Sequence, residues 1–250
     1  MYKMNNIIKG LLTSLGLLAF WQLFVVISKL PSYILPSPIL VGTVLIQQFP
    51  MFITQSIPTV IETLSGLLGA ILLGCFMALS MAYIATLRHW LKPVLLISQA
   101  LPTFAIAPLF VIWLGYGISA KIATTILMLF FPIASSFFDG LSRTDAAILD
   151  LAHIMKASRF RTLLHIRIPA AIPNLITGIR VATAGAPMGA VIGEWVGASK
   201  GLGFLMLNAN ARMEIDVMFA ALFILIVWSL LLYFTVDFLL KRYINWQREK

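Results

Sequence analysis

The residues best suited to chemistry in this sequence lie in one basic stretch, residues 150–169, which reads DLAHIMKASRFRTLLHIRIP. The chain around it is largely apolar, yet this stretch carries two histidines and four cations: His153, His165, Lys156, Arg159, Arg161 and Arg167. Charges at this density are costly inside a bilayer, so the stretch must rest on a surface outside it. Two surfaces fit: the anionic headgroups of the membrane, or a groove in another protein.

The spacing in and around this stretch predicts two short amphipathic helices. The first has Asp145 and Asp150 near its start and Lys156 near its end, which suits the helix dipole. The second covers residues 158–168, and Pro169 and Pro173 are expected to end it. Anionic lipid would account for the basic residues, whereas a protein groove would also bury the apolar face of the first helix. The apolar residues at helical spacing are Ile148, Leu151, Ala152 and Met155 in the first helix, and Phe160, Leu163, Leu164 and Ile168 in the second.

The overall composition is that of a membrane protein. Of 250 residues, 60% are hydrophobic and only 11% are charged, which is far from the balance of a soluble domain. The net charge of +9 does not indicate nucleic-acid binding, because the cations lie between apolar segments instead of covering one soluble face. The single cysteine, Cys75, excludes an intrachain disulfide and lies in an apolar run, as a small core residue would.

Apolar windows predict an all-α, polytopic membrane protein with six transmembrane helices in one domain, residues 1–250. The first window follows Lys3 and Lys9, as in a signal peptide, but it is too long and lacks a small-residue cleavage site, so we expect an uncleaved span. A loop of residues 139–174 separates the fourth and fifth windows. The windows are residues 10–28, 57–87, 93–114, 118–138, 175–197 and 217–240.

The distribution of Lys and Arg predicts the orientation. Thirteen of the 18 lie in the termini, in an expected turn at residues 88–92 and in the 139–174 loop, and another, Arg180, is expected near the start of the fifth span. Cytoplasmic loops carry an excess of cations, so both termini and the 139–174 loop are predicted to be cytoplasmic. The opposite side holds only Lys29, Lys121, Lys200 and Arg212.

The loop before the second span has a helix-start signal. Ser37 is a good N-cap and Pro38 suits the first helical position, so a short helix lying on the membrane surface is expected there. An irregular loop remains the alternative.

Small residues recur at every fourth position in the second and fifth spans. Such ridges let helix backbones approach closely in lipid. They serve either packing within one subunit or a sliding interface with a second subunit, and Pro187 in the fifth span is consistent with a kink beside a cavity. The glycines of the two ridges are Gly66 and Gly74, and Gly185, Gly189, Gly193 and Gly197.

Few polar groups lie inside the predicted spans. Gln99 and Thr103 share a face of the proline-rich third span, where they either line a polar path or satisfy backbone groups freed by Pro102 and Pro108. Glu62 and Glu194 are expected to reach water or a buried partner. No acidic or histidine series crosses the spans, so the chain itself shows no energy source.

The basic stretch resembles the EAA loop of permeases of binding-protein-dependent ABC importers. That motif reads Glu-Ala-Ala, three residues, Gly, nine residues, then Ile-x-Leu-Pro. Here Asp150-x-Ala152 begins it and Ile166-x-Ile168-Pro169 ends it at the matching distance. Leu151 replaces an alanine of the motif, and Lys156 stands at the glycine position, where a left-handed conformation suits glycine better.

The resemblance covers the whole chain. Leu35-Pro36-Ser37-Pro38, the proline-rich third span and Gly193-Glu194-Trp195 look like the nitrate, sulfonate and taurine branch. Gly201-Leu202-Gly203 and the segment from Asn208 to Met213 look most like permeases for thiamine pyrimidine precursors such as hydroxymethylpyrimidine.

The resemblance implies a permease that hydrolyses nothing and binds no cofactor or metal, with ATP and Mg held by a cytoplasmic ABC ATPase dimer. It also implies a solute-binding protein outside the bacterial inner membrane, a second permease copy in a homodimer, and no nucleic-acid partner. The residues implied in coupling to the ATPase are Ala147, Ile148, Asp150, Leu151, Ala152, Met155, Lys156, Arg159 and Pro169.

A pyrimidine substrate would need an aromatic platform and a few polar groups. The candidates are Gln99, Thr103, Thr183, Glu194, Trp195 and Asn208. Trp195 also suits the interfacial aromatic belt. Three rival functions remain at this point: the same machinery for taurine, an alkanesulfonate or nitrate, a gradient-driven carrier, and a membrane anchor for a cytoplasmic complex.

Overall fold

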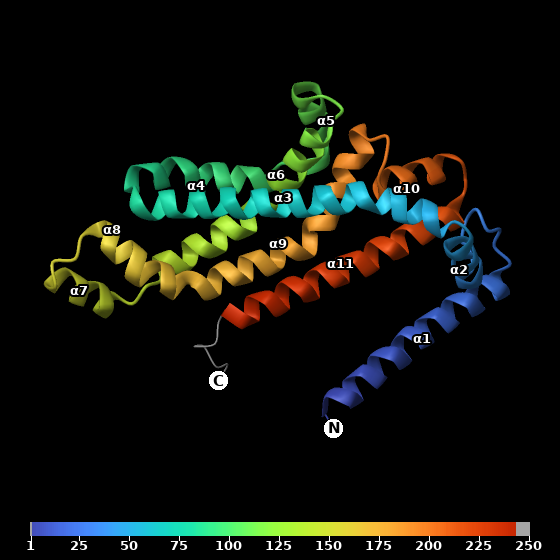
Figure 1. Ribbon diagram of the computed structural model, residues 1–250, viewed down its shortest axis with the longest axis horizontal. Helices are drawn as coiled ribbons and strands as arrows, with labels where there is room; N and C mark the ends of the chain where they lie inside the picture. The colour runs from blue at the N-terminus through green and yellow to red at the C-terminus, as the bar shows by residue number, and fades with distance from the viewer. Residues whose placement is uncertain (1, 244–250) are drawn as a thin grey trace.

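The computed structural model describes residues 2–243, and every regular element in that range is helical (Figure 1). The predicted all-α class is therefore confirmed. The elements are α1 (Tyr2–Ser28), α2 (Pro38–Gln47), α3 (Phe49–Tyr83), α4 (Ala85–Ala100), α5 (Thr103–Leu114), α6 (Ile118–Ser142), α7 (Ala146–Ile154), α8 (Arg159–Thr162), the π-helix η1 (Leu163–Arg167), α9 (Ile168–Gly197), α10 (Leu202–Ala211) and α11 (Ile215–Tyr243).

Four stretches in the described range are long and apolar enough to cross a membrane: α3, α6, the continuous α8–η1–α9 segment and α11. The pair α4 and α5 makes a fifth if it is counted as one broken span. The predicted first span, 10–28, lies in α1, whose described apolar part, Leu15–Ser28, is shorter than a full crossing. Five of the six predicted windows thus coincide with long helices or with the broken pair.

The centre of the bundle is α6, which lies between α3 and α9. Glycines make this close packing possible: a Cβ at Gly74 would meet the Ile133 side chain at 2.9 Å, and a Cβ at Gly189 would meet Thr125 Cα at 3.2 Å. Residues of all three helices, including Ala70, Ile133 and Ala186, form one buried cluster. Both small-residue ridges thus contact α6 of the same chain.

The third predicted span is not one helix. The axes of α4 and α5 differ by 105° at a break around Leu101 and Pro102. Proline forces the preceding residue out of the α-helical region, and Leu101 has ψ 122°. Pro93 and Pro108 lie inside α4 and α5 and cause no comparable break, so only one of the three prolines interrupts the span.

The expected turn at residues 88–92 is wrong. Those residues are helical and belong to α4, and the chain turns earlier, at Ile84, which has an extended conformation. Figure 1 shows α4 returning beside α3 from this turn.

The opposite end of the bundle is formed by α2, α10 and the start of α11. The predicted helix after Ser37 is present, because the Ser37 hydroxyl accepts a hydrogen bond from Leu40 N at 3.2 Å and caps α2. Phe52 of α3, Leu202 of α10 and Val217 of α11 share one buried cluster with α2. The sequence did not predict α10, which occupies the expected loop between the fifth and sixth spans.

The basic stretch forms α7, α8 and η1, and η1 runs directly into α9. Pro169 and Pro173 were expected to end the second amphipathic helix, which is wrong. Ile168 N bonds to Leu163 O in a π-turn directly before Pro169, and this wider turn accommodates the proline at the start of α9 without ending the helix. The chain from Arg159 to Gly197 is therefore continuous helix.

Candidate functional site

The first helix of the basic stretch, α7, is fixed at both ends by its own residues. Asp145 accepts a hydrogen bond from Ala147 N at 3.0 Å and caps its start. At its end, Ala157 N donates to Ala152 O and Lys156 N to His153 O, both at 2.9 Å. This is a Schellman motif, and Lys156 takes its left-handed position with φ 55°. A lysine thus adopts the conformation that glycine would take more easily.

The outward face of α7 is apolar. Ile148, Leu151 and Met155 are 47%, 56% and 74% exposed, and Ile154, which the sequence interpretation had not selected, is 77% exposed. Ala147, Asp150 and Lys156 are also exposed, as are Arg159 and Pro169 further along the chain. Ala152, by contrast, is only 4% exposed and faces the bundle. A connected apolar surface of this kind is typical of a protein-binding helix.

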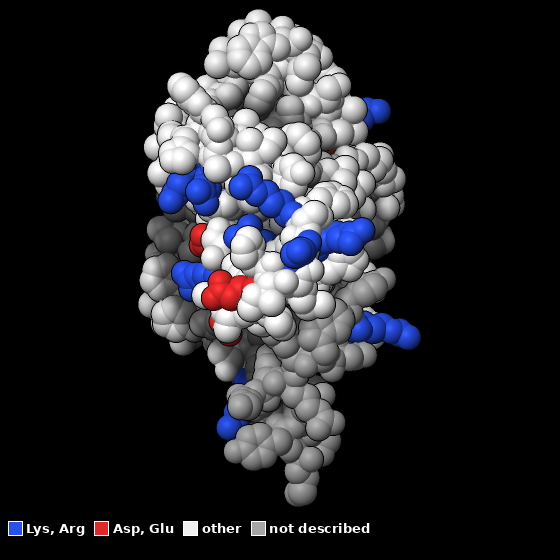
Figure 2. Space-filling view, turned by 90° about the vertical axis from the view of Figure 1, so that its left-hand side faces the viewer, with Lys and Arg blue, Asp and Glu red and all other residues white. Residues whose placement is uncertain are grey.

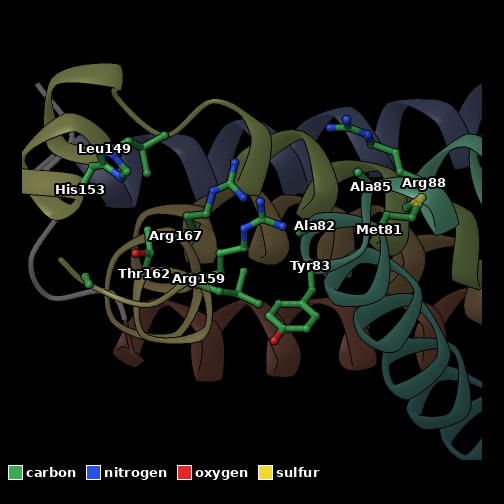
Figure 3. Close-up of a pocket in the computed structure, with 12 residues that line it drawn as sticks. Met81, Ala82, Tyr83, Ala85, Arg88, Leu149, His153, Arg159, Thr162 and Arg167 are labelled. Atoms are coloured by element: carbon green, nitrogen blue, oxygen red, sulfur yellow. The ribbon is translucent and has the colours of Figure 1, made fainter.

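Cations cover the same end of the molecule. Viewed from that side, Lys and Arg side chains spread across the surface and few acidic groups lie among them (Figure 2). A pocket of about 420 Å³ opens there between the end of α3, the start of α4, α7 and α8, and Arg88, Arg159 and Arg167 line it (Figure 3).

At the other end of α9, Glu194 joins three helices. Its carboxylate accepts hydrogen bonds from the Thr59 hydroxyl of α3 at 2.6 Å and from Gly203 N and Phe204 N at the start of α10. A carboxylate at a helix N-terminus is stabilised by free N–H groups and by the helix dipole. Glu194 thus ties α9 to α3 and α10.

Two positions next to the Glu194 carboxylate must be glycine, because a Cβ there would overlap it. Gly201 has φ 125°, and a Cβ at this position would overlap the Glu194 carboxylate. Gly201 N also donates to Gln55 Oε1, and Leu202 N to the Thr59 hydroxyl, both at 2.8 Å. The Gly-Leu-Gly sequence therefore allows the start of α10 to close over the carboxylate.

Two further ion pairs join helices. Lys121 of α6 lies 3.2 Å from Glu62 of α3, and both side chains are buried. Arg180 of α9 lies 2.7 Å from Asp237 of α11, which Lys241 also approaches at 2.8 Å. Glu62 thus has a buried partner, which was one of the two expected alternatives. Lys121 was assigned to the outer loops, so its pairing with Glu62 was not predicted.

The six candidate substrate contacts do not converge within one chain. Glu194 is occupied by the hydrogen bonds above, and the Thr183 hydroxyl donates to Ile179 O of its own helix at 2.7 Å. Gln99 and Thr103 flank the α4–α5 break, and Trp195 is 49% exposed on α9. Asn208 lines a pocket at the α2–α10 end with Gln48 and Arg212. Within residues 2–243, no group of three His, Cys, Asp or Glu side chains could hold a metal ion.

Residues 70–245 match the family model described as "Binding-protein-dependent transport system inner membrane component". The chain belongs to this family. It is the permease component of an ABC import system, and ATP hydrolysis belongs to a separate subunit. The resemblance seen in the sequence is thereby confirmed at the level of the family.

Curated relatives cover nearly the whole permease. A "Probable ABC transporter permease protein" of Haemophilus influenzae is 45% identical over 96% of this chain and 98% of its own. The "Formylaminopyrimidine transport permease protein ThiX" of Halalkalibacterium halodurans is 31% identical over 94% of each chain. The "Riboflavin transport system permease protein RibX" of Chloroflexus aurantiacus is 32% identical over 94% of this chain and 88% of its own.

Other relatives place the permease in the predicted branch, since they include proteins named for aliphatic sulfonates and taurine. Among solved structures, the inward-facing MetNI methionine ABC transporter has a matching chain with a TM-score of 0.66 at 18% identity, covering 77% of this chain and 97% of that one. That likeness confirms the permease fold.

Proposed function

We propose that this permease works as a homodimer that moves a thiamine pyrimidine precursor from an external binding protein into the cytoplasm, driven by an ABC ATPase dimer docked on α7. The observation that carries the docking assignment is the exposed apolar face of α7, formed by Ile148, Leu151, Ile154 and Met155. Asp150 and Lys156 flank it and would make polar contacts at its edge. Closure of the ATPase dimer would then move α7 and the helices attached to it.

The orientation in the membrane follows from the charges. Figure 1 shows that α1 and α11 both direct their chain-terminal ends toward the end of the bundle that carries α7. The same end carries the basic surface of Figure 2. The excess of cations on cytoplasmic surfaces therefore supports cytoplasmic termini and a cytoplasmic α7 in a bacterial inner membrane.

The α4–α5 break supports a second permease copy. Residues 99–102 around the break are exposed in the single chain. Irregular backbone at membrane depth cannot face lipid, because its polar groups would lack hydrogen bonds. The sixteen residues of α4 extend about 24 Å, which places the break well inside the bilayer. A partner copy, with a polar path between the two, would cover this region.

The position of the α4–α5 break beside the proposed path also favours Gln99 and Thr103 as substrate contacts over Thr183 and Glu194. The last two use their oxygens in hydrogen bonds inside the chain. Trp195 and Asn208 are partly exposed and would contribute only if the partner copy brought them to the same path.

The substrate class rests on the relatives. Formylaminopyrimidine and riboflavin, named for two relatives of 31% and 32% identity, both contain a pyrimidine ring. Permeases named for aliphatic sulfonates and taurine are 28% and 29% identical, so an alkanesulfonate or taurine is the second candidate.

Reconstituted transport tests the proposal. The permease, its ATPase and its binding protein are placed in proteoliposomes, and uptake of hydroxymethylpyrimidine, formylaminopyrimidine, riboflavin, taurine and nitrate is compared with and without ATP. We expect ATP-dependent uptake of a pyrimidine that requires all three components. Uptake by the permease alone under a proton or sodium gradient would establish a carrier, and docking without any uptake would establish an anchor.

A further inference from the structure

The basic pocket at the α7 end continues into an apolar groove. The groove has a volume of about 520 Å³ and runs along Phe76, Leu79, Leu164 and Ile168, between α3 and the η1–α9 segment. Tyr83 and Leu163 line both the pocket and the groove, so the two form one elongated site with a charged end and an apolar end.

The charged end lacks acidic partners. Arg88, Arg159 and Arg167 line it, whereas no Asp or Glu of the described residues does. None of the ion pairs formed within residues 2–243 involves these three arginines. Figure 3 shows Arg159 and Arg167 side by side above Tyr83, with Arg88 across the pocket. Three arginines that lie close together without carboxylate partners favour an anionic ligand.

The apolar end is formed partly by the apolar residues of the second predicted amphipathic helix. Phe160 is 58% exposed and Leu164 46% exposed, while Leu163 is buried beneath them. Phe160 contacts Tyr83 edge to face, with ring centroids 6.5 Å apart, and this pair stands where the charged end meets the groove. Aromatic rings of this kind are typical of the headgroup level of a membrane.

We propose that this site binds one anionic phospholipid of the cytoplasmic leaflet. The phosphate would lie among Arg88, Arg159 and Arg167, and an acyl chain would follow the groove past Leu79 toward Phe76. The bound lipid would contact α3, α4 and η1 at once, and thus the base from which α7 projects. The assignment to the cytoplasmic leaflet rests on the proposed function, whereas the lipid chemistry follows from the site alone.

Two other ligands would fill only the charged end of the site. A free phosphate would pair with the arginines but leave the groove empty. An acidic side chain of a docked ATPase would do the same, because the groove extends along α3 into the predicted span. Only a ligand with an anionic head and an apolar tail fills both ends.

Native mass spectrometry of the purified permease, without ATPase or binding protein, tests the site. We expect dioleoylphosphatidylglycerol to be retained in preference to dioleoylphosphatidylcholine. We expect dihexanoylphosphatidylglycerol, which has the same headgroup and short chains, to bind more weakly. Arg88→Gln and Arg167→Gln should each reduce the preference for phosphatidylglycerol about fivefold, the effect of one cation near a membrane surface.

The matched control is Lys200→Gln, which removes a cation at the α9–α10 turn, and it should leave lipid retention unchanged. Melting temperature and elution volume of each variant distinguish loss of the site from loss of folding. Equal retention of the two dioleoyl lipids, or equal effects of Arg88→Gln and Lys200→Gln, would overturn the proposal.

Inorganic phosphate at matched ionic strength distinguishes a free-anion site, since displacement of the lipid by phosphate contradicts a lipid site. Displacement by added ATPase would assign the pocket to the ATPase interface instead and would equally contradict it. Because transport is not measured, failure of this test leaves the proposed import function unaffected.

Discussion

At the scale of single residues, Lys156 is the clearest case of a residue in a backbone conformation that favours another residue type. It stands at the left-handed position of the Schellman motif that ends α7, with φ 55°. A side chain with a Cβ costs about 1 kcal/mol in this conformation relative to glycine. Lys156→Gly should therefore stabilise the end of α7 by about that amount, measured by thermal or denaturant unfolding in detergent. Lys156→Ala is the matched control, since it removes the charge but keeps the Cβ; if both variants behave alike, the backbone argument fails.

At Gly201 the opposite effect is expected, because replacing this glycine should lower stability. Its φ of 125° and the adjacent Glu194 carboxylate leave no room for a side chain. Gly201→Ala should destabilise the permease by about 2 kcal/mol or more, because the start of α10 must move off the carboxylate. Gly42→Ala in α2, where nothing lies within 4 Å of an added Cβ, should be neutral or slightly stabilising in the same unfolding measurement. The double variant Gly201→Ala/Glu194→Ala should lose less stability than the sum of the two single losses, and a purely additive result would show that the two residues are not coupled.

At the scale of elements, signals between neighbouring residues predicted where helices start, whereas features that depend on contacts between distant segments were not predicted. Ser37 and Asp145 cap α2 and α7 because a cap depends only on the next few residues. The break before Pro102 could not be distinguished from the unbroken helices around Pro93 and Pro108, because each proline has the same local chemistry. The helix α10 was also missed. The N–H groups at its start donate to Glu194, Thr59 and Gln55, and Thr59 and Gln55 belong to α3, far away in the sequence.

The α9 ridge allows a comparison within one helix. A Cβ at Gly185 would meet only Leu129 Cδ2 at 3.5 Å, an ordinary contact, whereas a Cβ at Gly189 would meet Thr125 Cα at 3.2 Å. Gly189→Leu should force α9 away from α6 at a cost of about 1–3 kcal/mol, with lower yield of folded dimer. Gly185→Ala should be tolerated, and size-exclusion chromatography with thermal unfolding measures both. Normal stability of Gly189→Leu would contradict the close contact of α6 and α9.

At the scale of the whole molecule, one continuous helical segment connects the two ends of the bundle. It begins at Arg159, beside α7, passes through the π-turn, and reaches Glu194, which holds α3 and α10. Such a segment extends over 39 residues, or about 60 Å at the rise of an α-helix. A displacement of α7 therefore has a direct mechanical connection to the far end of the permease.

That connection makes α7 the place where import and ATP hydrolysis can be separated. Leu151 is 56% exposed in the middle of the apolar face, so Leu151→Arg should place a charge in the ATPase groove and reduce uptake at least about tenfold. Asp150→Arg should act in the same direction through the edge of the interface.

Ala146→Arg adds the same charge to an exposed position well round the helix from Leu151 and should retain most of the uptake. Membrane yield of the permease, its co-purification with the ATPase and ATP-dependent uptake are measured for each variant. If Leu151→Arg and Ala146→Arg lose uptake equally, the charge acts without regard to the apolar face, and α7 is not the docking helix.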